Sequence, residues 1–369
     1  MGTQPALLEE VEVLIASTEI GRRAEALRRV TDLFASGSTV FSDDQRALFD
    51  DVMSRLVSEI DTTARAAFGR RIAAVPEAPP HVLRALALDD EISVAEPVLS
   101  GAEHLDDEVL VEGARTKSQE HLLAISRRST LVEAVTDVLV ERGNKEVALS
   151  TAQNPGAKFS EFGYSTLVQR SETDGDLALR VWQRPELPRQ FMLKIFAQAS
   201  ETVRAQLEEA DRGKATLFRN MIVKASDQLQ TEARQRSAEY AAAESRVRAL
   251  HRAGKLNESQ LAAFASAGQF DETTIALSLM GDLPIGLIER ATTQSLSEQI
   301  LVLAKAIGLS WDTTKAILRL QAGGKSNSTQ EIETLFTQFV QMKPATAIKA
   351  MQFYRLLERA SGPKQPGHH

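Results

Sequence analysis

A basic cluster surrounds one tryptophan in the stretch LRVWQRPELPRQFMLK, and its residue types suit the binding of anions. The stretch places four cations and one acid around Trp182: Arg180, Arg184, Arg189, Lys194 and Glu186. Arg180 and Arg184 are four residues apart, so on a helix they would share a face. The pair Arg127 and Arg128 lies at an equivalent place in an earlier repeat of the pattern described below, and could extend the cluster.

Guanidinium groups along one ridge would bind phosphates, an acidic peptide or an anionic small molecule. The candidate binding residues are therefore Arg127, Arg128, Arg180, Trp182, Arg184 and Arg189. The simpler interpretation is a solvated helix face on which Trp182 fills a gap between repeats, and we favour it on the sequence alone.

The tetrapeptide LDDE occurs twice within residues 88–110, a stretch without Lys or Arg. Its acids could form a metal site or an acid–base cluster: Asp89, Asp90, Glu91, Asp106, Asp107 and Glu108. Each group also stands where a helix is expected to begin, and an Asp at an N-cap contributes roughly 1 kcal/mol. Acids in the first turn gain about 0.3–1 kcal/mol from the helix dipole. Because Asp174, Asp271 and Asp312 also stand at expected helix starts, capping explains the acids without a metal. The local negative charge could still bind a basic partner.

Other motifs give no support for an enzyme. The segment AGGKSNST resembles a phosphate-binding loop, but Arg319 stands where that motif needs its first glycine, and the segment follows an expected helix. The internal histidines stand singly, with no HExxH spacing, and no nucleophile motif occurs. Cysteine is absent, which excludes disulfides and thiolate chemistry. We therefore expect no enzymatic activity, no cofactor and no metal site.

Composition and charge indicate a soluble helical protein. Aromatic residues make up only 5% of the 369 residues while Ala and Leu are plentiful, which suits packed helices better than a β-sandwich. The net charge of −7 argues against a general binder of nucleic acid or anionic membranes, although a local basic patch would remain compatible with it. No apolar run approaches the ~18–20 residues of a membrane helix, and the N-terminus carries acids where a signal peptide carries bases. We expect a cytoplasmic protein.

A pattern recurs about every 27 residues from residue 70 onward, and a period of this length is typical of stacked helical repeats. The stretch RIAAVPEAPPHVLRALA aligns with RVWQRPELPRQFMLKIFA four such units later, and intermediate copies begin at Val98, Ala124 and Leu149. In each copy a short apolar helix meets a turn and a second helix follows. After Gly254 the same period returns, with Gly281 aligned on Gly308.

Residues 213–253 predict one long helix, because they contain no Pro and no internal Gly. A heptad seam of modest quality runs along it: Leu229, Ala233, Arg236, Tyr240, Ala243, Val247 and Leu250. The seam could pair with a second copy in a homodimer, or it could pack against its own protein.

The PEAPP and PELPR turns of the short two-helix units resemble HEAT-type and leucine-rich-variant helical repeats. The chain, including HRAGKLNESQL and LMGDLPIGLIERA, resembles an uncharacterised bacterial family of HEAT-like proteins over most of residues 70–320. The resemblance implies a fold and carries over no functional residue.

The expected fold is all-α: an α-solenoid of short two-helix HEAT-like repeats, one long helix and a smaller C-terminal helical region. The expected parts are capping helices at 1–69, the repeat array at 70–212, the connecting helix at 213–253, a C-terminal helical domain at 254–361 and a disordered tail at 362–369.

The expected function is that of a non-enzymatic scaffold or adaptor in bacterial signalling or regulation, since stacked repeats usually bind other proteins. Two alternatives stay open. One is a HEAT-like protein that binds nucleic acid, which the net charge disfavours. The other is a sensor of an anionic metabolite or signalling nucleotide, bound on the arginine ridge.

Overall fold

The computed structural model describes residues 20–37, 41–210, 215–293, 297–322 and 329–361. In these residues all regular structure is helical, apart from one isolated β-bridge between Leu131 and Ala157, so the expected all-α class is confirmed. The chain forms two compact units, unit 1 (residues 1–163) and unit 2 (residues 164–369). This division falls inside the expected 70–212 array. The expected tail at 362–369 lies outside the described residues.

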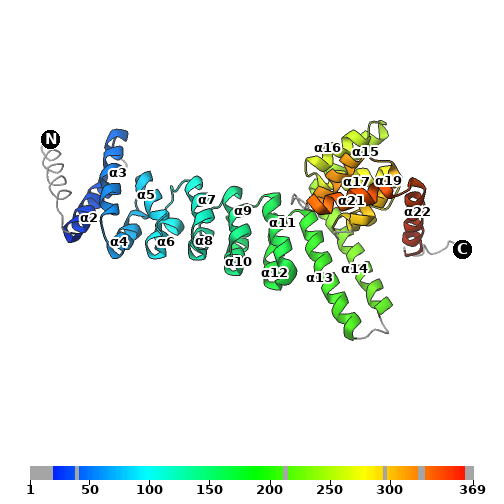
Figure 1. The fold of residues 1–369 in the computed structure, drawn as a ribbon, viewed down its shortest axis with the longest axis horizontal. Helices are drawn as coiled ribbons and strands as arrows, with labels where there is room; N and C mark the ends of the chain where they lie inside the picture. The colour runs from blue at the N-terminus through cyan, green and yellow to red at the C-terminus, as the bar shows by residue number, and fades with distance from the viewer. Residues whose placement is uncertain (1–19, 38–40, 211–214, 294–296, 323–328, 362–369) are drawn as a thin grey trace. The chain divides into compact units, whose positions relative to one another are not determined.

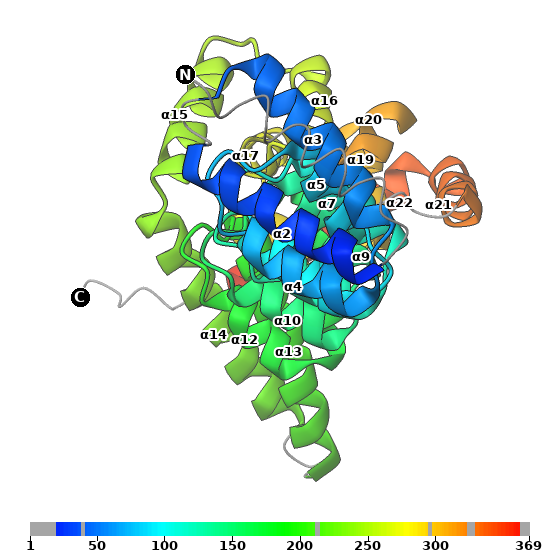
Figure 2. The same cartoon turned by 90° about the vertical axis from the view of Figure 1, so that its left-hand side faces the viewer.

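Unit 1 consists of short helices packed in two rows, and Figures 1 and 2 show these rows from the side and end-on. Along one row α2 packs on α4, α4 on α6, α6 on α8 and α8 on α10, while α3, α5, α7 and α9 form the other row. The helices are α2 (Ile20–Gly37), α3 (Asp43–Ser58), α4 (Thr62–Ile72), α5 (Pro80–Ala87), α6 (Ile92–Gly101), α7 (Asp107–Thr116), α8 (Gln119–Ser126), α9 (Glu133–Arg142) and α10 (Lys145–Gln153). The next helix, α11 (Glu161–Arg170), spans the division between the units.

The predicted period is confirmed by where these helices begin. In one row α6 begins at Ile92 and α8 at Gln119. In the other row α5 begins at Pro80 and α7 at Asp107, which is the same interval. Helices this short are not stable alone in water. Each therefore depends on a buried stripe, such as Val94, Ala95, Val98 and Leu99 in α6. Burying each large aliphatic side chain contributes about 1.5–3 kcal/mol.

The acids of the two LDDE segments lie at helix starts, as the sequence predicts, but they do not cap α6 or α7 through their side chains. Asp89 accepts a hydrogen bond from Nε of Arg65 at 2.8 Å, and Asp90 accepts one from Nζ of Lys117 at 2.5 Å. Arg65 belongs to α4 and Lys117 follows the end of α7, so the two carboxylates join neighbouring repeats. The part of the chain that the structure describes gathers no three His, Asp or Glu side chains as a metal site would need.

Unit 2 combines a pair of long helices with a compact bundle. Its helices are α12 (Gly175–Trp182), α13 (Arg189–Ala210), α14 (Ala215–Arg236), α15 (Ala238–Arg252), α16 (Glu258–Ser266), α17 (Phe270–Gly281), α18 (Ile285–Thr293), α19 (Ser297–Ile307), α20 (Trp311–Gln321), α21 (Thr329–Gln341) and α22 (Pro344–Ser361), with a short 3-10 turn η1 (Ser171–Thr173) before α12. Helices α13 and α14 pack against each other, and one apolar core joins α15 to α22. The period returns here as predicted, because α17 begins at Phe270 and α19 begins one period later, at Ser297.

The expected single helix at 213–253 is wrong, because the chain forms two helices there. Ser237 adopts an extended backbone between α14 and α15, and its hydroxyl accepts a hydrogen bond from the amide of Tyr240. This N-cap satisfies one of the amides that a new helix leaves without a partner. Tyr240, Ala243 and Val247 of the expected heptad seam are buried in the core of unit 2. None of the helices among the described residues is both long and apolar enough to span a membrane.

Candidate functional site

Arg128 is buried in unit 1, where its guanidinium completes the end of a neighbouring helix. It donates hydrogen bonds to the carbonyl oxygens of Leu99 at 2.7 Å and Ala102 at 2.8 Å, at the C-terminus of α6. The last carbonyls of a helix have no partner within the helix, and a cation placed there satisfies them. Burial lowers the pKa of the Arg128 guanidinium. Its neighbour Arg127 is exposed and lies 3.8 Å from Glu96.

Arg184 and Arg189 of the predicted ridge are buried in unit 2. Nε of Arg184 donates to Glu186 at 2.7 Å, within the turn before α13. Arg189 begins α13 and pairs with Asp271 and Glu289. Lys194 donates to the carbonyl of Gln321 at 2.7 Å. Arg189 and Lys194 therefore join α13 to other parts of unit 2, Arg184 is paired within its own turn, and these cations are not arranged as a row open to a ligand.

The structure leaves Arg180 and Trp182 at the surface of α12. Trp182 is 37% exposed, and Leu179, three residues earlier and on the same helix face, is 51% exposed. Arg180 lies between them in the sequence, and its Nη1 lies 3.5 Å from Oε1 of Gln183. We call Leu179, Arg180 and Trp182 the α12 face. Sequence reasoning missed Leu179, although its spacing from Trp182 was a usable signal.

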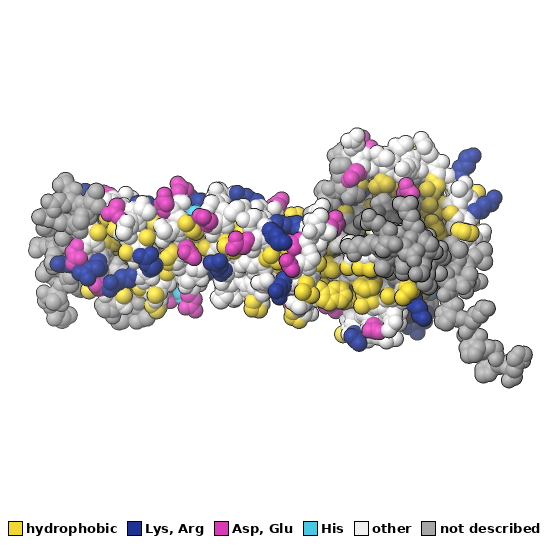
Figure 3. Space-filling view, turned by 90° about the horizontal axis from the view of Figure 1, so that it is seen from below, with side chains coloured by type: hydrophobic (Ala, Val, Ile, Leu, Met, Phe, Trp, Pro, Cys, Tyr) yellow, Lys and Arg dark blue, Asp and Glu magenta, His cyan; other side chains and the backbone are white. Residues whose placement is uncertain are grey.

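Charges of both signs are mixed along the surface of unit 1. On the face of the described residues drawn in Figure 3, cations lie interspersed with acids along this unit. Charged side chains of unit 1 also pair between repeats, as Arg84 does with Glu112. The α12 face, in contrast, combines one cation with two exposed apolar side chains.

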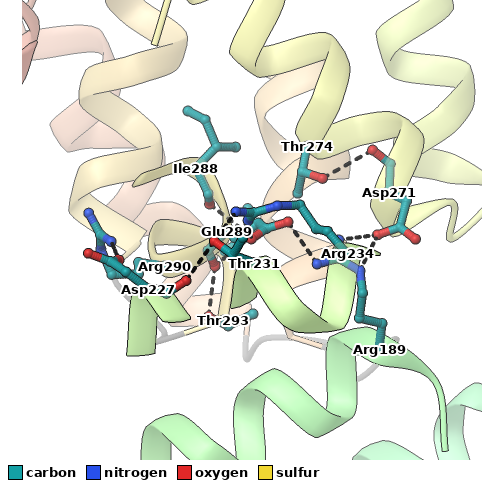
Figure 4. Close-up of polar contacts among 11 residues, drawn as sticks. Arg189, Asp227, Thr231, Arg234, Asp271, Thr274, Ile288, Glu289, Arg290 and Thr293 are labelled. Atoms are coloured by element: carbon teal, nitrogen blue, oxygen red, sulfur yellow. Dashed lines mark hydrogen bonds and ion pairs between the residues drawn. The ribbon is translucent and has the colours of Figure 1, made fainter. Parts of the chain in front are cut away.

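A buried network of charges lies at the centre of unit 2 and is drawn in Figure 4. Glu289 of α18 is fully buried, and its two carboxylate oxygens accept hydrogen bonds from different arginines. Arg189 of α13 donates to Oε1 at 2.7 Å, and Arg234 of α14 donates to Oε2 at 2.5 Å. Arg189 also pairs with Asp271 of α17, and Arg290 pairs with Asp227. The network thus ties four helices together.

Opposing effects set the ionisation of this network. Burial raises the pKa of Glu289, and the two arginines act against burial. Burial alone would lower the pKa of Arg189, but Glu289 and Asp271 outweigh it and raise that pKa. With two guanidinium groups in direct contact, we assign Glu289 as a carboxylate at neutral pH. Sequence reasoning missed this residue, although its place beside Ile288 on the buried side of an apolar helix was a signal.

A pocket of about 550 Å³ adjoins the network. Its lining comes from α14, α15, α17, the turn before α18 and the first residue of α18, and Arg234 belongs to both the pocket and the network. Tyr240 also lines the pocket, and the guanidinium carbon of Arg189 lies 4.8 Å from the centre of its ring. Burial, helped by Glu244 and Glu289, raises the pKa of Tyr240 to about 12. The phenol therefore stays protonated at neutral pH and can donate a hydrogen bond.

Fold and surface together define an all-helical protein of repeat-like helix pairs with an apolar α12 face and a polar-rimmed pocket. Residues 94–352 match the family described as "Uncharacterised protein conserved in bacteria (DUF2336)", and the chain belongs to this family. The match includes the α12 face, the network and the pocket. Neither the curated proteins nor the solved structures contain a match to the chain.

Proposed function

We propose that the chain is a non-enzymatic scaffold, built as an α-solenoid of HEAT-like repeats, that binds a protein partner through the α12 face. The observation that carries the proposal is the exposure of Leu179 and Trp182 on one side of α12 with Arg180 beside them. Trp and Arg are enriched among the residues that dominate binding energy in protein interfaces. A stack of short helix pairs with a period of about 27 residues from α5 to α10 supports the solenoid, because each repeat then buries its apolar stripe against the next.

The two alternatives from the sequence both depend on a ridge of arginines open to an anion. Arg128, Arg184 and Arg189 direct their donors to carbonyls and carboxylates inside the protein. A phosphate backbone needs several accessible cations, and Arg127 and Arg180 alone offer few. We therefore propose a protein partner in preference to nucleic acid or a nucleotide on this ridge.

The test compares two double variants that remove equally exposed apolar side chains. Leu179→Ser with Trp182→Ser changes the α12 face. Leu48→Ser with Val132→Ser changes unit 1, where these residues are 47% and 37% exposed. Each protein is cross-linked in cells, and co-purifying proteins are quantified. We expect partners retained by the wild type and the Leu48/Val132 variant to fall by tenfold or more in the α12 variant, because a dominant interface residue is worth roughly 2 kcal/mol or more.

Two results would overturn the proposal. One is a set of partners that both variants retain equally, and the other is the absence of any reproducible partner of the wild-type chain. Melting curves of the purified variants show whether both remain folded.

A further inference from the structure

We propose that the pocket between α14, α15, α17 and the turn before α18 binds a small aliphatic monocarboxylate. This inference is independent of the α12 face and of any protein partner. The volume of about 550 Å³ lies within the range of roughly 300–1,000 Å³ that small-molecule sites occupy.

The charges on the pocket wall favour a ligand with a single negative charge. Arg234 and Arg248 are the cations of the lining, and Glu244 is its one acid. Arg234 donates to Glu289 and, through Nη2, to Thr231 at 2.9 Å, and these two bonds use only part of its five N–H groups. Arg248 contacts Glu244 through Nε at 2.9 Å and Nη2 at 2.8 Å, which leaves its Nη1 group for a ligand. Each lining arginine is thus balanced by a carboxylate, Arg234 by Glu289 behind the wall and Arg248 by Glu244, and each keeps N–H donors that a single anionic group can accept from.

The apolar wall favours an aliphatic chain over a nucleotide. It consists of Ile275, Leu279, Leu283, Pro284 and Ile285. Nucleobases stack on open aromatic faces, and the one aromatic residue of the lining, Tyr240, already has Arg189 over its ring. Several phosphates would also need more cations than this wall offers. A ligand with one carboxylate could accept hydrogen bonds from the arginines at the rim and pack an aliphatic chain of several carbons against the apolar wall.

The ligand would also contact several helices at once. Thr231 and Arg234 belong to α14, Tyr240 and Arg248 to α15, and the apolar wall to α17, its following turn and the first residue of α18. A ligand that contacts all three binds only the folded protein, so it raises the melting temperature, and the rise grows with the logarithm of ligand concentration above the Kd. This gives a readout that needs no knowledge of the cellular function.

The experiment uses the full chain and octanoate as the probe, with titration calorimetry and thermal melting as readouts. Octan-1-ol tests the need for the carboxylate, octylammonium tests the sign of the charge, and AMP tests the nucleotide alternative. We expect saturable binding of octanoate with a rise in melting temperature, and at least about tenfold weaker binding of the other three compounds, because a charge-assisted contact to arginine is lost or reversed.

Three variants locate the site. Arg248→Gln removes the rim cation, and Leu279→Glu places an acid on the apolar wall. Arg252→Gln is the matched control, because Arg252 is an exposed arginine one turn further along α15 and outside the pocket lining. We expect octanoate binding to weaken about fivefold or more in Arg248→Gln, to vanish in Leu279→Glu and to stay unchanged in Arg252→Gln, with all three melting cooperatively without ligand.

The proposal is wrong if octanoate does not bind at millimolar concentration, or if Arg248→Gln and Arg252→Gln bind it equally well. It is also wrong if octan-1-ol or AMP binds as tightly as octanoate. None of these outcomes bears on the α12 face, because that test measures protein partners.

Discussion

Arg189 and Glu289 are 100 residues apart in the chain, yet Nη1 of the arginine lies 2.7 Å from Oε1 of the glutamate in the interior of unit 2. The other carboxylate oxygen is held by Arg234, so Glu289 stands between cations from α13 and α14. Removing two or three charges from water costs several kcal/mol, and only close pairing offsets that cost. The position of the long helices against α18 therefore depends on the integrity of this pairing.

Neutralising Glu289 should destabilise the protein strongly. In Glu289→Gln the buried arginines lose their shared counter-charge. We expect the free energy of unfolding, measured in urea, to fall by about 3 kcal/mol. Circular dichroism at increasing urea concentration measures this. Glu232→Gln is the control, because Glu232 pairs with Arg236 on the exposed side of α14 and should contribute less than about 0.5 kcal/mol. Equal losses in the two variants would show that the buried network does not stabilise unit 2.

Tyr240 should make the protein sensitive to alkaline pH. Its folded-state pKa of about 12 exceeds the ordinary value of 10, so the folded protein holds a proton that the unfolded chain releases between these pH values. The contribution of the protonated phenol to the free energy of unfolding is fully present below pH 10. It is lost as the pH rises through 12, and the total loss is on the order of 2 kcal/mol.

Urea unfolding at pH 8 and pH 11 tests this expectation in the wild type and in Tyr240→Phe. The phenylalanine variant cannot ionise at this position, so it should lose less stability than the wild type between the two pH values. Tyr354→Phe controls for the loss of a phenol elsewhere. If Tyr240→Phe and the wild type decline in parallel, the buried phenol is not the group responsible.

The sequence predicted local features of the fold well, because local signals determine them. Apolar spacing and short turns indicated the all-helical class and the repeat period, which the starts of α6 and α8 reproduce. The break between α14 and α15 was missed because its signal is a single Ser237 in a segment without Pro or Gly. Serine is a good N-cap residue but also occurs inside helices, so a single serine among good helix formers does not mark a break by itself.

The hydrogen-bond and ion-pair partners of the arginines could not be predicted from local sequence patterns. Arg128 donates to backbone carbonyls that lie 26 and 29 residues away in the sequence, and Arg189 donates to Glu289, 100 residues away. Carbonyl acceptors occur at every residue, so the sequence gives no sign of which will lack a partner. Of the predicted cluster, only Arg180 and Trp182 stay together at the surface of α12.

Neighbouring arginines in unit 1 should differ sharply in their contribution to stability. Arg128→Met leaves the carbonyls of Leu99 and Ala102 without their donor, and we expect a loss of about 2–4 kcal/mol. Arg127→Met removes an exposed side chain with one distant ionic contact, and should change stability by less than about 1 kcal/mol. Urea unfolding of the two variants measures the difference. An equal effect at both positions would mean that the end of α6 does not need Arg128.

The turn between α10 and α11 should tolerate no side chain at Gly156. A Cβ atom at this position would lie 1.8 Å from the carbonyl oxygen of Ser129, a backbone atom that cannot rotate away. The same turn forms the bridge to Leu131, whose amide donates to the carbonyl of Gly156 at 3.0 Å. Gly156→Ala should therefore cost at least about 1–3 kcal/mol, the usual range for overpacking.

Gly101 provides the opposite case within the same unit. It is the last residue of α6, and no atom lies within 4 Å of a Cβ built there. Gly101→Ala should leave stability unchanged or raise it by up to about 1 kcal/mol, because alanine loses less backbone entropy in a helix. Melting temperatures should thus move in opposite directions, or fall only for Gly156→Ala. A fall of similar size in both variants would mean that the cost arises from the lost flexibility of glycine and not from the close approach to Ser129.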